Sequence, residues 1–260
     1  MTQVSNVWVA EAADLHVARQ ITSDNFAMLR IAETPAGMFL VTGDNGKLWS
    51  IPADGSNHTL FAAARGAPVL CGPFVLFLED TGTMILMRAN ADGSHPTPLV
   101  NNGDIVDATC SPDGKLVFYA SLTRPQKIRR ITVEGGAPVD VTTAPGDGIM
   151  CRFGISPDGK HIAYVYRTLT DNPASGWRVD VIPADGGPTE KTIKVPAGIW
   201  ALCWAPDGRG VQFLFTLNGV TNVWEQRFEG GPPKQLSRFT SGQMFDFNWS
   251  PAHASRRNQE

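Results

Sequence analysis

Three copies of one phrase bring together side chains that could do chemistry in this chain of 260 residues. The segment CSPDGKLVFYAS at 110–121 combines a thiol, a hydroxyl, a carboxylate and an amine. ISPDGKHIAYVY at 155–166 and WAPDGRGVQFLF at 204–215 repeat most of it. Nucleophilic and general acid–base catalysis use these groups, so each copy is first a candidate catalytic site.

A serine hydrolase would need a nucleophile elbow of the form G-x-S-x-G. The nearest string is GISPDG, in which Asp158 takes the place of the second glycine, so Ser156 is predicted to be a turn residue. The sequence has no Walker phosphate loop, dinucleotide fingerprint or kinase catalytic loop. The histidines fall at different positions of the repeats and suggest no metal cluster: His16, His58, His95, His161 and His253.

The repeated aspartates Asp113, Asp158 and Asp207 could form a ring of carboxylates. A tight turn explains them fully, because Pro fixes φ, Asp bonds the nearby backbone and Gly takes a positive φ. We therefore predict no catalytic residue, no metal site and no cofactor.

The phrase recurs with the period of a propeller blade. Six prolines mark the register at intervals of 38 to 49 residues: Pro35, Pro73, Pro112, Pro157, Pro206 and Pro251. Between these register prolines lies a second turn signal, such as IPADGG at 182–187. Each unit reads as four short strands, for example 105–110, 116–121, 127–133 and 138–143. The prediction is an all-β fold, a β-propeller of about six four-stranded antiparallel blades with one incomplete.

These motifs resemble the WD40-like PD40 repeats of TolB-type bacterial propellers. WAPDGRGVQFLF, KLWSIPADG and VWEQRFEGGPPKQLSRFT carry the resemblance, whereas VLCGPFVLF at 69–77 has lost its P-D-G. Similar repeats occur in prolyl-oligopeptidase-type peptidases and attached to bacterial serine/threonine kinases or DNA-binding regulators. The resemblance implies a fold more strongly than a function.

We call the strands of a blade a to d, from the channel outwards. The expected propeller domain covers 1–251, with half a blade at 1–24, five full blades at 25–240 and a last inner strand at 241–251. The segment 252–260 is a polar tail. Because no strand b is evident to join that last strand a to the opening c and d, either the closing blade is incomplete or the chain is a piece of a longer protein.

One column of strand a departs from the apolar pattern. Five residues before the register prolines stand Arg30, Asp107, Arg152 and Asp246, together with Pro68 and Ala201. Strand a lines the channel, where an unpaired charge is costly. We therefore predict two structural ion pairs between neighbouring blades, Asp107 with Arg152 and Asp246 with Arg30.

Antiparallel strand order sends the a–b and c–d turns to one face, the turn face, and the b–c and d–a connections to the other, the loop face. Longer loops on a rigid scaffold commonly carry recognition. The candidate binding residues on the loop face are Arg124, Gln126, Lys127, Asp171, Asn172 and Trp177, with Asp104 and Asp147 at the channel mouth.

Composition limits the partners. The net charge of −3 and the scattered Lys and Arg argue against nucleic acid, and no apolar stretch approaches a membrane span. The four widely spaced cysteines are expected to be buried free thiols, with a disulfide or a metal site as alternatives. No signal peptide is evident, the compartment and oligomeric state are unassigned, and a periplasmic parent protein stays open.

Two classes of function remain. The first is a non-catalytic scaffold that binds a protein or peptide. The alternative is a propeller split from a larger protein: the C-terminal sensor of a serine/threonine kinase or transcriptional regulator, or the propeller of a prolyl-oligopeptidase-type peptidase without its catalytic domain.

Overall fold

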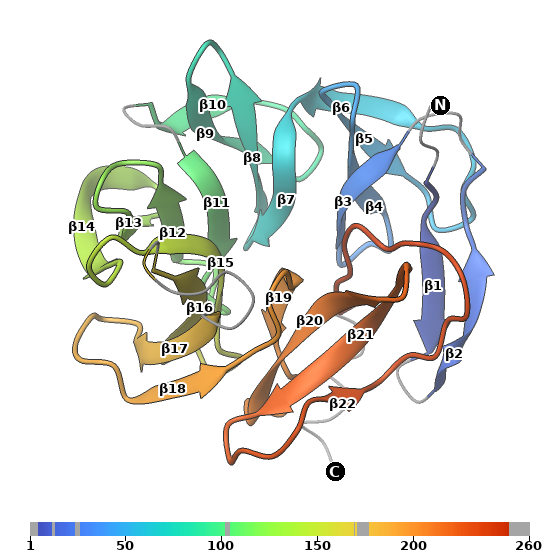
Figure 1. Cartoon of the computed structure of the whole chain (residues 1–260). Coiled ribbons are helices and arrows are strands. Elements are labelled where there is room, and N and C mark those ends of the chain that lie inside the picture. Colours follow the sequence, from blue (N-terminus) through green and yellow to red (C-terminus); the bar gives the residue numbers. More distant parts are fainter. Residues whose placement is uncertain are drawn as a thin grey trace.

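Five antiparallel four-stranded sheets surround a central channel in the computed structural model, which describes residues 5–11, 14–23, 27–101, 105–168, 170 and 177–249 (Figure 1). The blades follow the chain in order. The first blade consists of β3 (Met28–Glu33), β4 (Phe39–Gly43), β5 (Lys47–Ile51) and β6 (Thr59–Ala63), and the second of β7 (Arg65–Cys71), β8 (Phe74–Asp80), β9 (Met84–Asn90) and β10 (Thr97–Val100). The third consists of β11 (Ile105–Cys110), β12 (Leu116–Ser121), β13 (Lys127–Thr132) and β14 (Gly135–Thr143), and the fourth of β15 (Ile149–Ile155), β16 (His161–Arg167), β17 (Arg178–Pro183) and β18 (Lys191–Lys194). The fifth consists of β19 (Trp200–Trp204), β20 (Gly210–Leu217), β21 (Val220–Arg227) and β22 (Lys234–Gln235).

The prediction of an all-β propeller with four-stranded antiparallel blades is confirmed. The number of complete blades is five, against about six predicted. The half blade expected at the N-terminus forms a separate two-stranded sheet of β1 (Trp8–Glu11) and β2 (Asp14–Gln20), which lies between the first and fifth blades (Figure 1).

The last inner strand predicted at 241–251 is wrong as a strand. Residues 243–249 belong to no sheet in the described part of the chain. Side-chain contacts hold them between the first and fifth blades, as shown below. The apolar alternation of MFDFNW predicted a strand, but alternation alone cannot supply the neighbouring strand with which it would pair.

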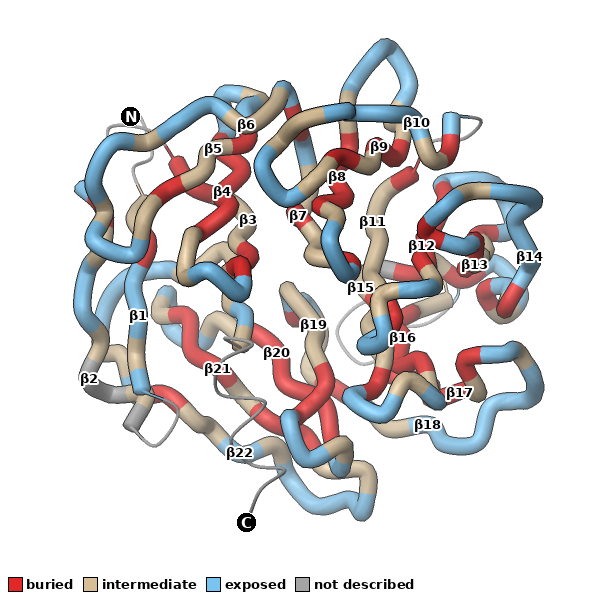
Figure 2. The backbone as a smooth tube through the Cα atoms, turned by 180° about the vertical axis from the view of Figure 1, so that it is seen from behind, coloured by how far each residue is buried: buried red, intermediate tan, exposed pale blue. Residues whose placement is uncertain are grey.

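The core consists of apolar layers between neighbouring blades. One cluster joins β12 to β16 through Phe118 and Tyr164, and another joins β16 to β20 through Val165 and Phe213. Strand b is the most buried strand of a blade, as the fully buried β4 shows. Figure 2 shows buried residues concentrated along β20, the strand b of the fifth blade, and along its neighbour β21. Packing between the faces of neighbouring blades therefore holds the blades together.

The P-D-G turns are built as the sequence predicts. In the third blade the Ser111 hydroxyl donates to Asp113 at 2.6 Å, and the Lys115 amide donates to the same carboxylate at 3.1 Å. Gly114 has a φ of +73°, and a Cβ there would meet the backbone of Gly72 in the neighbouring blade. The turn therefore needs glycine both for its conformation and for close packing between blades.

The expectation of free thiols is wrong for two of the cysteines. Cys71 and Cys110 form a disulfide that joins the inner strands β7 and β11 of neighbouring blades. Both cysteines stand two residues before a register proline, so the repeat brings them side by side across the blade boundary. Cys203 is a free thiol.

Candidate functional site

Charged side chains gather in the channel, where the innermost strands enclose a cavity of about 360 Å³. Arg30, Asp107, Arg152 and Asp246, the four residues predicted for this position, all line it. A β-bulge lies next to Arg30, Asp107 and Arg152 in their strands and alters the pairing there. The structure thus brings the four together in one polar cavity.

The two aspartates accept equivalent hydrogen bonds. The Ile31 amide of the first blade donates to Asp246 Oδ2 at 3.1 Å, and the Phe153 amide of the fourth blade donates to Asp107 of the third. Both donors stand four residues before a register proline. Each carboxylate therefore links one innermost segment to the next blade.

Burial raises the pKa of the Asp107 carboxyl, and the charges of Arg152 and Arg30 oppose that rise. Burial also raises the pKa of Asp246 to about 6, against the opposing charges of Arg30 and Arg152. The Arg30 guanidinium donates to the Phe245 carbonyl at 3.0 Å. The two ion pairs predicted among these residues stay a prediction. The contacts described above are hydrogen bonds between their side chains and backbone groups.

The loop-face candidates differ in their surroundings. Arg124 and Asp147 are exposed, as binding residues would be. Lys127 pairs with Asp140 at 2.5 Å on its own blade. Trp177 is partly buried and packs against the core between the fourth and fifth blades. Asp104, Asp171 and Asn172 lie outside the described residues.

Gln126 does not belong to the binding surface, which corrects the prediction made for it. It is only 4% exposed, and its Oε1 accepts a hydrogen bond from the Met150 amide at 2.6 Å. The side chain thus ties the third blade to the first residues of β15. Its polar character suggested a surface role, but a buried backbone amide needs such an acceptor.

Exposed apolar side chains on the loop face were missed by the sequence reasoning. Leu122 follows β12, Trp200 begins β19 and Leu217 ends β20, so all three lie where b–c or d–a connections emerge. Their exposed fractions are 53%, 54% and 52%. Ala201, directly after Trp200, has a φ of 29°, which is unusual for a residue other than glycine. The signal available in the sequence was an apolar residue at the end of a predicted strand.

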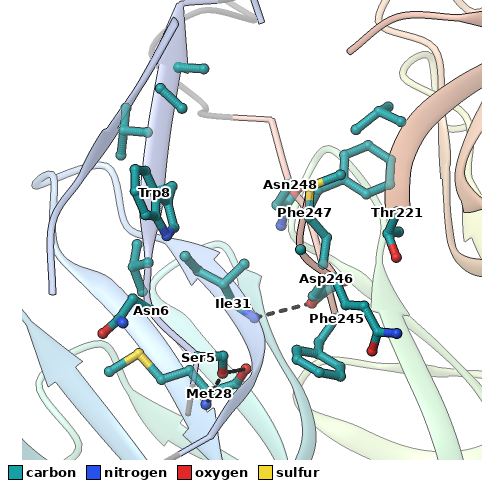
Figure 3. Close-up of a pocket in the computed structure, with 18 of the residues that line it drawn as sticks. Ser5, Asn6, Trp8, Met28, Ile31, Thr221, Phe245, Asp246, Phe247 and Asn248 are labelled. Atoms are coloured by element: carbon teal, nitrogen blue, oxygen red, sulfur yellow. Dashed lines mark hydrogen bonds between the residues drawn. The ribbon is translucent and has the colours of Figure 1, made fainter. Parts of the chain in front are cut away.

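A larger apolar groove of about 750 Å³ opens between β1 and residues 243–249 (Figure 3). Trp8, Val9 and Ala10 form one wall, and Phe245 and Phe247 form the other. Figure 3 shows the hydrogen bond from Ile31 to Asp246 at its base.

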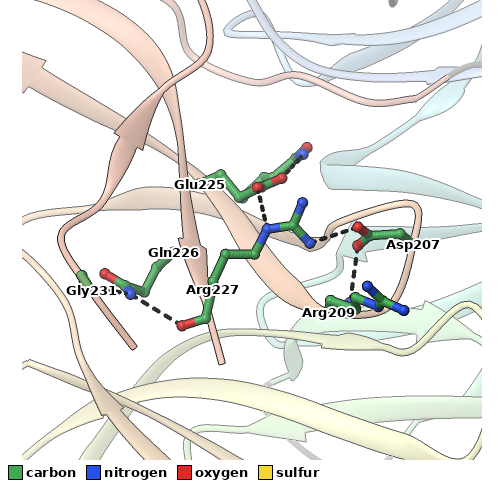
Figure 4. Close-up of polar contacts among 7 residues, drawn as sticks. Asp207, Arg209, Glu225, Gln226, Arg227 and Gly231 are labelled. Atoms are coloured by element: carbon green, nitrogen blue, oxygen red, sulfur yellow. Dashed lines mark hydrogen bonds and ion pairs between the residues drawn. The ribbon is translucent and has the colours of Figure 1, made fainter. Parts of the chain in front are cut away.

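The turn face, by contrast, is occupied by internal polar contacts. Asp207 accepts from the Arg209 amide at 3.0 Å and pairs with Arg227 at 2.6 Å (Figure 4). Arg227 also pairs with Glu225 at 2.8 Å. The hydroxyl of Ser156 donates to Asp158 and lowers the pKa of that carboxyl. The predicted turn role of these aspartates and of Ser156 accounts for their hydrogen bonds.

Two further properties bear on function. The described residues contain no group of three or more His, Cys, Asp or Glu side chains that could hold a metal ion. Within the same part of the chain, no helix has the length and apolar character needed to cross a membrane.

The comparison of sequences gives one curated relative. Dipeptidyl-peptidase 5 of Porphyromonas gingivalis is 25% identical over 155 residues, which make up 55% of this chain and 22% of the relative. The chain therefore spans about a fifth of the length of that relative. No protein-family model matches the chain.

The comparison of structures defines the class of fold. A protein described as a TolB from Agrobacterium tumefaciens matches with a TM-score of 0.73 and 20% identity, covering 91% of this chain and 90% of that one. TolB from Acinetobacter baumannii matches with a TM-score of 0.67 and 17% identity, covering 85% of this chain and 60% of that one. The protein is a β-propeller. Its fold is that of TolB-like propellers, as the repeats predicted.

Proposed function

We propose that this protein is a non-catalytic recognition propeller that binds a protein or peptide on its loop face. The observation that carries the proposal is the group of exposed apolar side chains there, Leu122, Trp200 and Leu217. Large exposed apolar residues on a rigid scaffold are typical of interaction sites, and tryptophan is enriched among the residues that dominate binding.

The electrostatic character of the loop face supports the same proposal. Arg124 and Asp147 are exposed in connections of the same face, so this face offers charges of both signs as well as apolar side chains. A polar rim around apolar anchors is the usual anatomy of a protein interface. The charged groups of the turn face described above are engaged with each other.

The proposal is tested by capturing partners from cells and measuring their affinity for purified variants. Trp200→Ala is expected to weaken binding by more than about tenfold, as loss of a central aromatic anchor does. Leu60→Ala is the matched control, because Leu60 is equally exposed, at 57%, but lies on the outer strand β6. Equal losses for the two variants, or no loss for Trp200→Ala, would count against the loop face.

A second candidate is that the chain is the propeller of a larger peptidase. The 25% identity with dipeptidyl-peptidase 5, of which the chain covers 22%, favours it. Reading the genomic sequence on both sides of the coding region tests it. A G-x-S-x-G elbow in the same reading frame would support the peptidase, and a stop codon directly after Glu260 with no catalytic domain upstream would oppose it.

We also propose that the ring has six blade positions, with β1, β2 and residues 243–249 in the sixth. Two tryptophan contacts to the preceding blade support this. Trp204 Nε1 donates to the Gly154 carbonyl of the preceding blade at 2.9 Å, and Trp249 Nε1 donates to Gln212 Oε1 of the fifth blade at 2.7 Å. Both tryptophans stand two residues before a register proline. We infer that residues 243–249 take the place of a strand a and that a single propeller domain covers 1–251.

A further inference from the structure

We propose that the groove between β1 and residues 243–249 binds an extended apolar segment of another polypeptide, which completes the sixth blade as its strand b. The inference rests on the six-position ring proposed above but not on the loop-face surface. Its first support is position. Residues 243–249 take the place of strand a through Asp246 and Trp249, and β1 with β2 takes the places of strands c and d.

The exposure of β1 is the second support. In each complete blade, strand c pairs with strand b and has at most one exposed residue. β1 is instead largely exposed, with Trp8 at 55% and Val9 at 38%. A tryptophan at the edge of a sheet, beside an apolar groove, is the surface that a further strand would cover.

The backbone of β1 offers hydrogen bonds toward the groove. The Ile21 amide donates to the Val7 carbonyl, so the pair Val7 and Ile21 is hydrogen-bonded. Bonded and non-bonded pairs alternate in an antiparallel ladder. The N–H and C=O groups of Trp8 and Ala10, opposite Gln20 and Ala18, therefore point away from β2 and toward the groove.

The lining of the groove defines the chemistry of the added segment. Its walls carry Trp8, Val9, Phe245, Phe247 and Val223, so buried side chains of the segment must be apolar. The strands b of the five complete blades are five to eight residues long and mostly buried. The expected occupant is an uncharged, extended apolar stretch of that length, bound by main-chain pairing on both edges.

The chain's own residues in the register of this strand do not have that chemistry. In the third and fourth blades, strand b begins four residues after the register proline, at Leu116 and His161. The corresponding stretch after Pro251 is SRRNQE at 255–260, which has two arginines, a glutamate and no apolar residue. Burying such charges between two strands is costly, so residues 255–260 do not have the chemistry expected of the missing strand b.

The test uses the full chain and two labelled synthetic peptides. KLVFYAS, the sequence of the third blade's strand b with the preceding lysine, has the expected chemistry, and AHASRRNQE copies residues 252–260. Fluorescence anisotropy is expected to show saturable binding of KLVFYAS and at least about tenfold weaker binding of AHASRRNQE. Hydrogen exchange should slow at the amides of Trp8 and Ala10 when KLVFYAS is bound.

Two variants of the chain separate this groove from other sites. Ala10→Pro removes one groove-facing N–H while leaving the pairing with β2, and edge strands tolerate proline at such positions. It should weaken binding of KLVFYAS by more than about tenfold, whereas Trp200→Ala on the loop face should leave it unchanged. If Ala10→Pro does not fold, the exchange measurement on the unaltered chain decides alone.

The proposal is overturned if KLVFYAS fails to bind at about 1 mM, or if it binds without slowing exchange at Trp8 and Ala10. Equal binding of AHASRRNQE would assign the groove to the chain's own tail. Dimerisation of the chain that Ala10→Pro abolishes would assign the groove to a second copy, and this outcome also overturns the proposal.

Discussion

At the residue scale, the channel holds two carboxylates at equivalent ring positions in surroundings that disfavour charge. Asp107 and Asp246 each accept a hydrogen bond from a backbone amide of the next blade, and burial raises both pKa values. The arginines Arg30 and Arg152 oppose this effect without abolishing it. The stability of the ring is therefore coupled to pH through its channel.

Replacement of Asp246 by asparagine should remove part of this pH dependence. The pKa of Asp246 is raised from 3.8 to about 6, so the folded state binds more protons than the unfolded state between these values. The contribution of Asp246 to stability is complete below the lower value and is lost as the pH rises through the higher one. Urea unfolding at several pH values should show Asp246→Asn gaining stability relative to the unaltered protein as the pH rises from about 4 to about 7.

Asparagine can still accept the hydrogen bond from the Ile31 amide, which makes the comparison specific for charge. The carboxylates of the turns, such as Asp158, have a lowered pKa and change stability in the opposite sense in both proteins. Only the difference between the two proteins is therefore informative. A difference in the free energy of unfolding that does not vary with pH would contradict the raised pKa of Asp246.

Sequence reasoning predicted which channel residues share a column but not their contacts. The repeat placed Arg30, Asp107, Arg152 and Asp246 at one register position, and all four line one cavity. β-Bulges change the strand pairing beside three of them, and an apolar alternation does not reveal a bulge. In the same way, no local sequence pattern showed that the Gln126 side chain would accept a hydrogen bond from a buried amide of the next blade.

At the element scale, most strands followed from turn chemistry and period. The P-D-G and D-G-G turns fixed the hairpins of the complete blades, and the alternation between them predicted strands a and b well. Residues 243–249 show the limit of this reasoning, because a strand exists only where another backbone pairs with it. Their sequence matches a strand a, and Asp246 accepts the Ile31 amide as Asp107 accepts the Phe153 amide, but these contacts form no strand ladder.

The two-stranded sheet approaches the first blade closely at one glycine. Gly55, in the turn between β5 and β6, has a φ of +76°, and a Cβ there would overlap the Ile21 carbonyl just after β2. Gly37 has nearly the same φ, +77°, but open space around its Cα. The two positions therefore separate steric overlap from conformational strain.

Gly37→Ala should lower the free energy of unfolding by about 1 kcal/mol through its positive φ alone. Gly55→Ala should cost at least about 1 kcal/mol more, because the backbone at Ile21 must move. Urea unfolding measures both values. Equal costs would show that the two-stranded sheet is not packed on the first blade as described.

At the scale of the whole molecule, a covalent link reinforces one of the boundaries between blades. The disulfide between Cys71 and Cys110 joins residues 39 positions apart in the chain. Replacing both by alanine should lower the free energy of unfolding by roughly 2–4 kcal/mol, because the unfolded chain gains freedom. Denaturant unfolding with and without a reductant tests this prediction.

The reductant should destabilise the unaltered protein and leave the double variant unaffected. Cys203→Ala is the matched control, because Cys203 is a free thiol and its removal should preserve the response to reductant. A double variant that still responds to reductant would contradict this pairing of cysteines.

We propose that the propeller recognises a partner on the loop face. The most direct measurement is hydrogen exchange of the protein with and without its captured partner, because slowed exchange maps the contact. We predict slower exchange around Leu122, Trp200 and Leu217 and no change in the turns at Asp113 and Asp158. Protection confined to those turns, with the loop face unchanged, would contradict it.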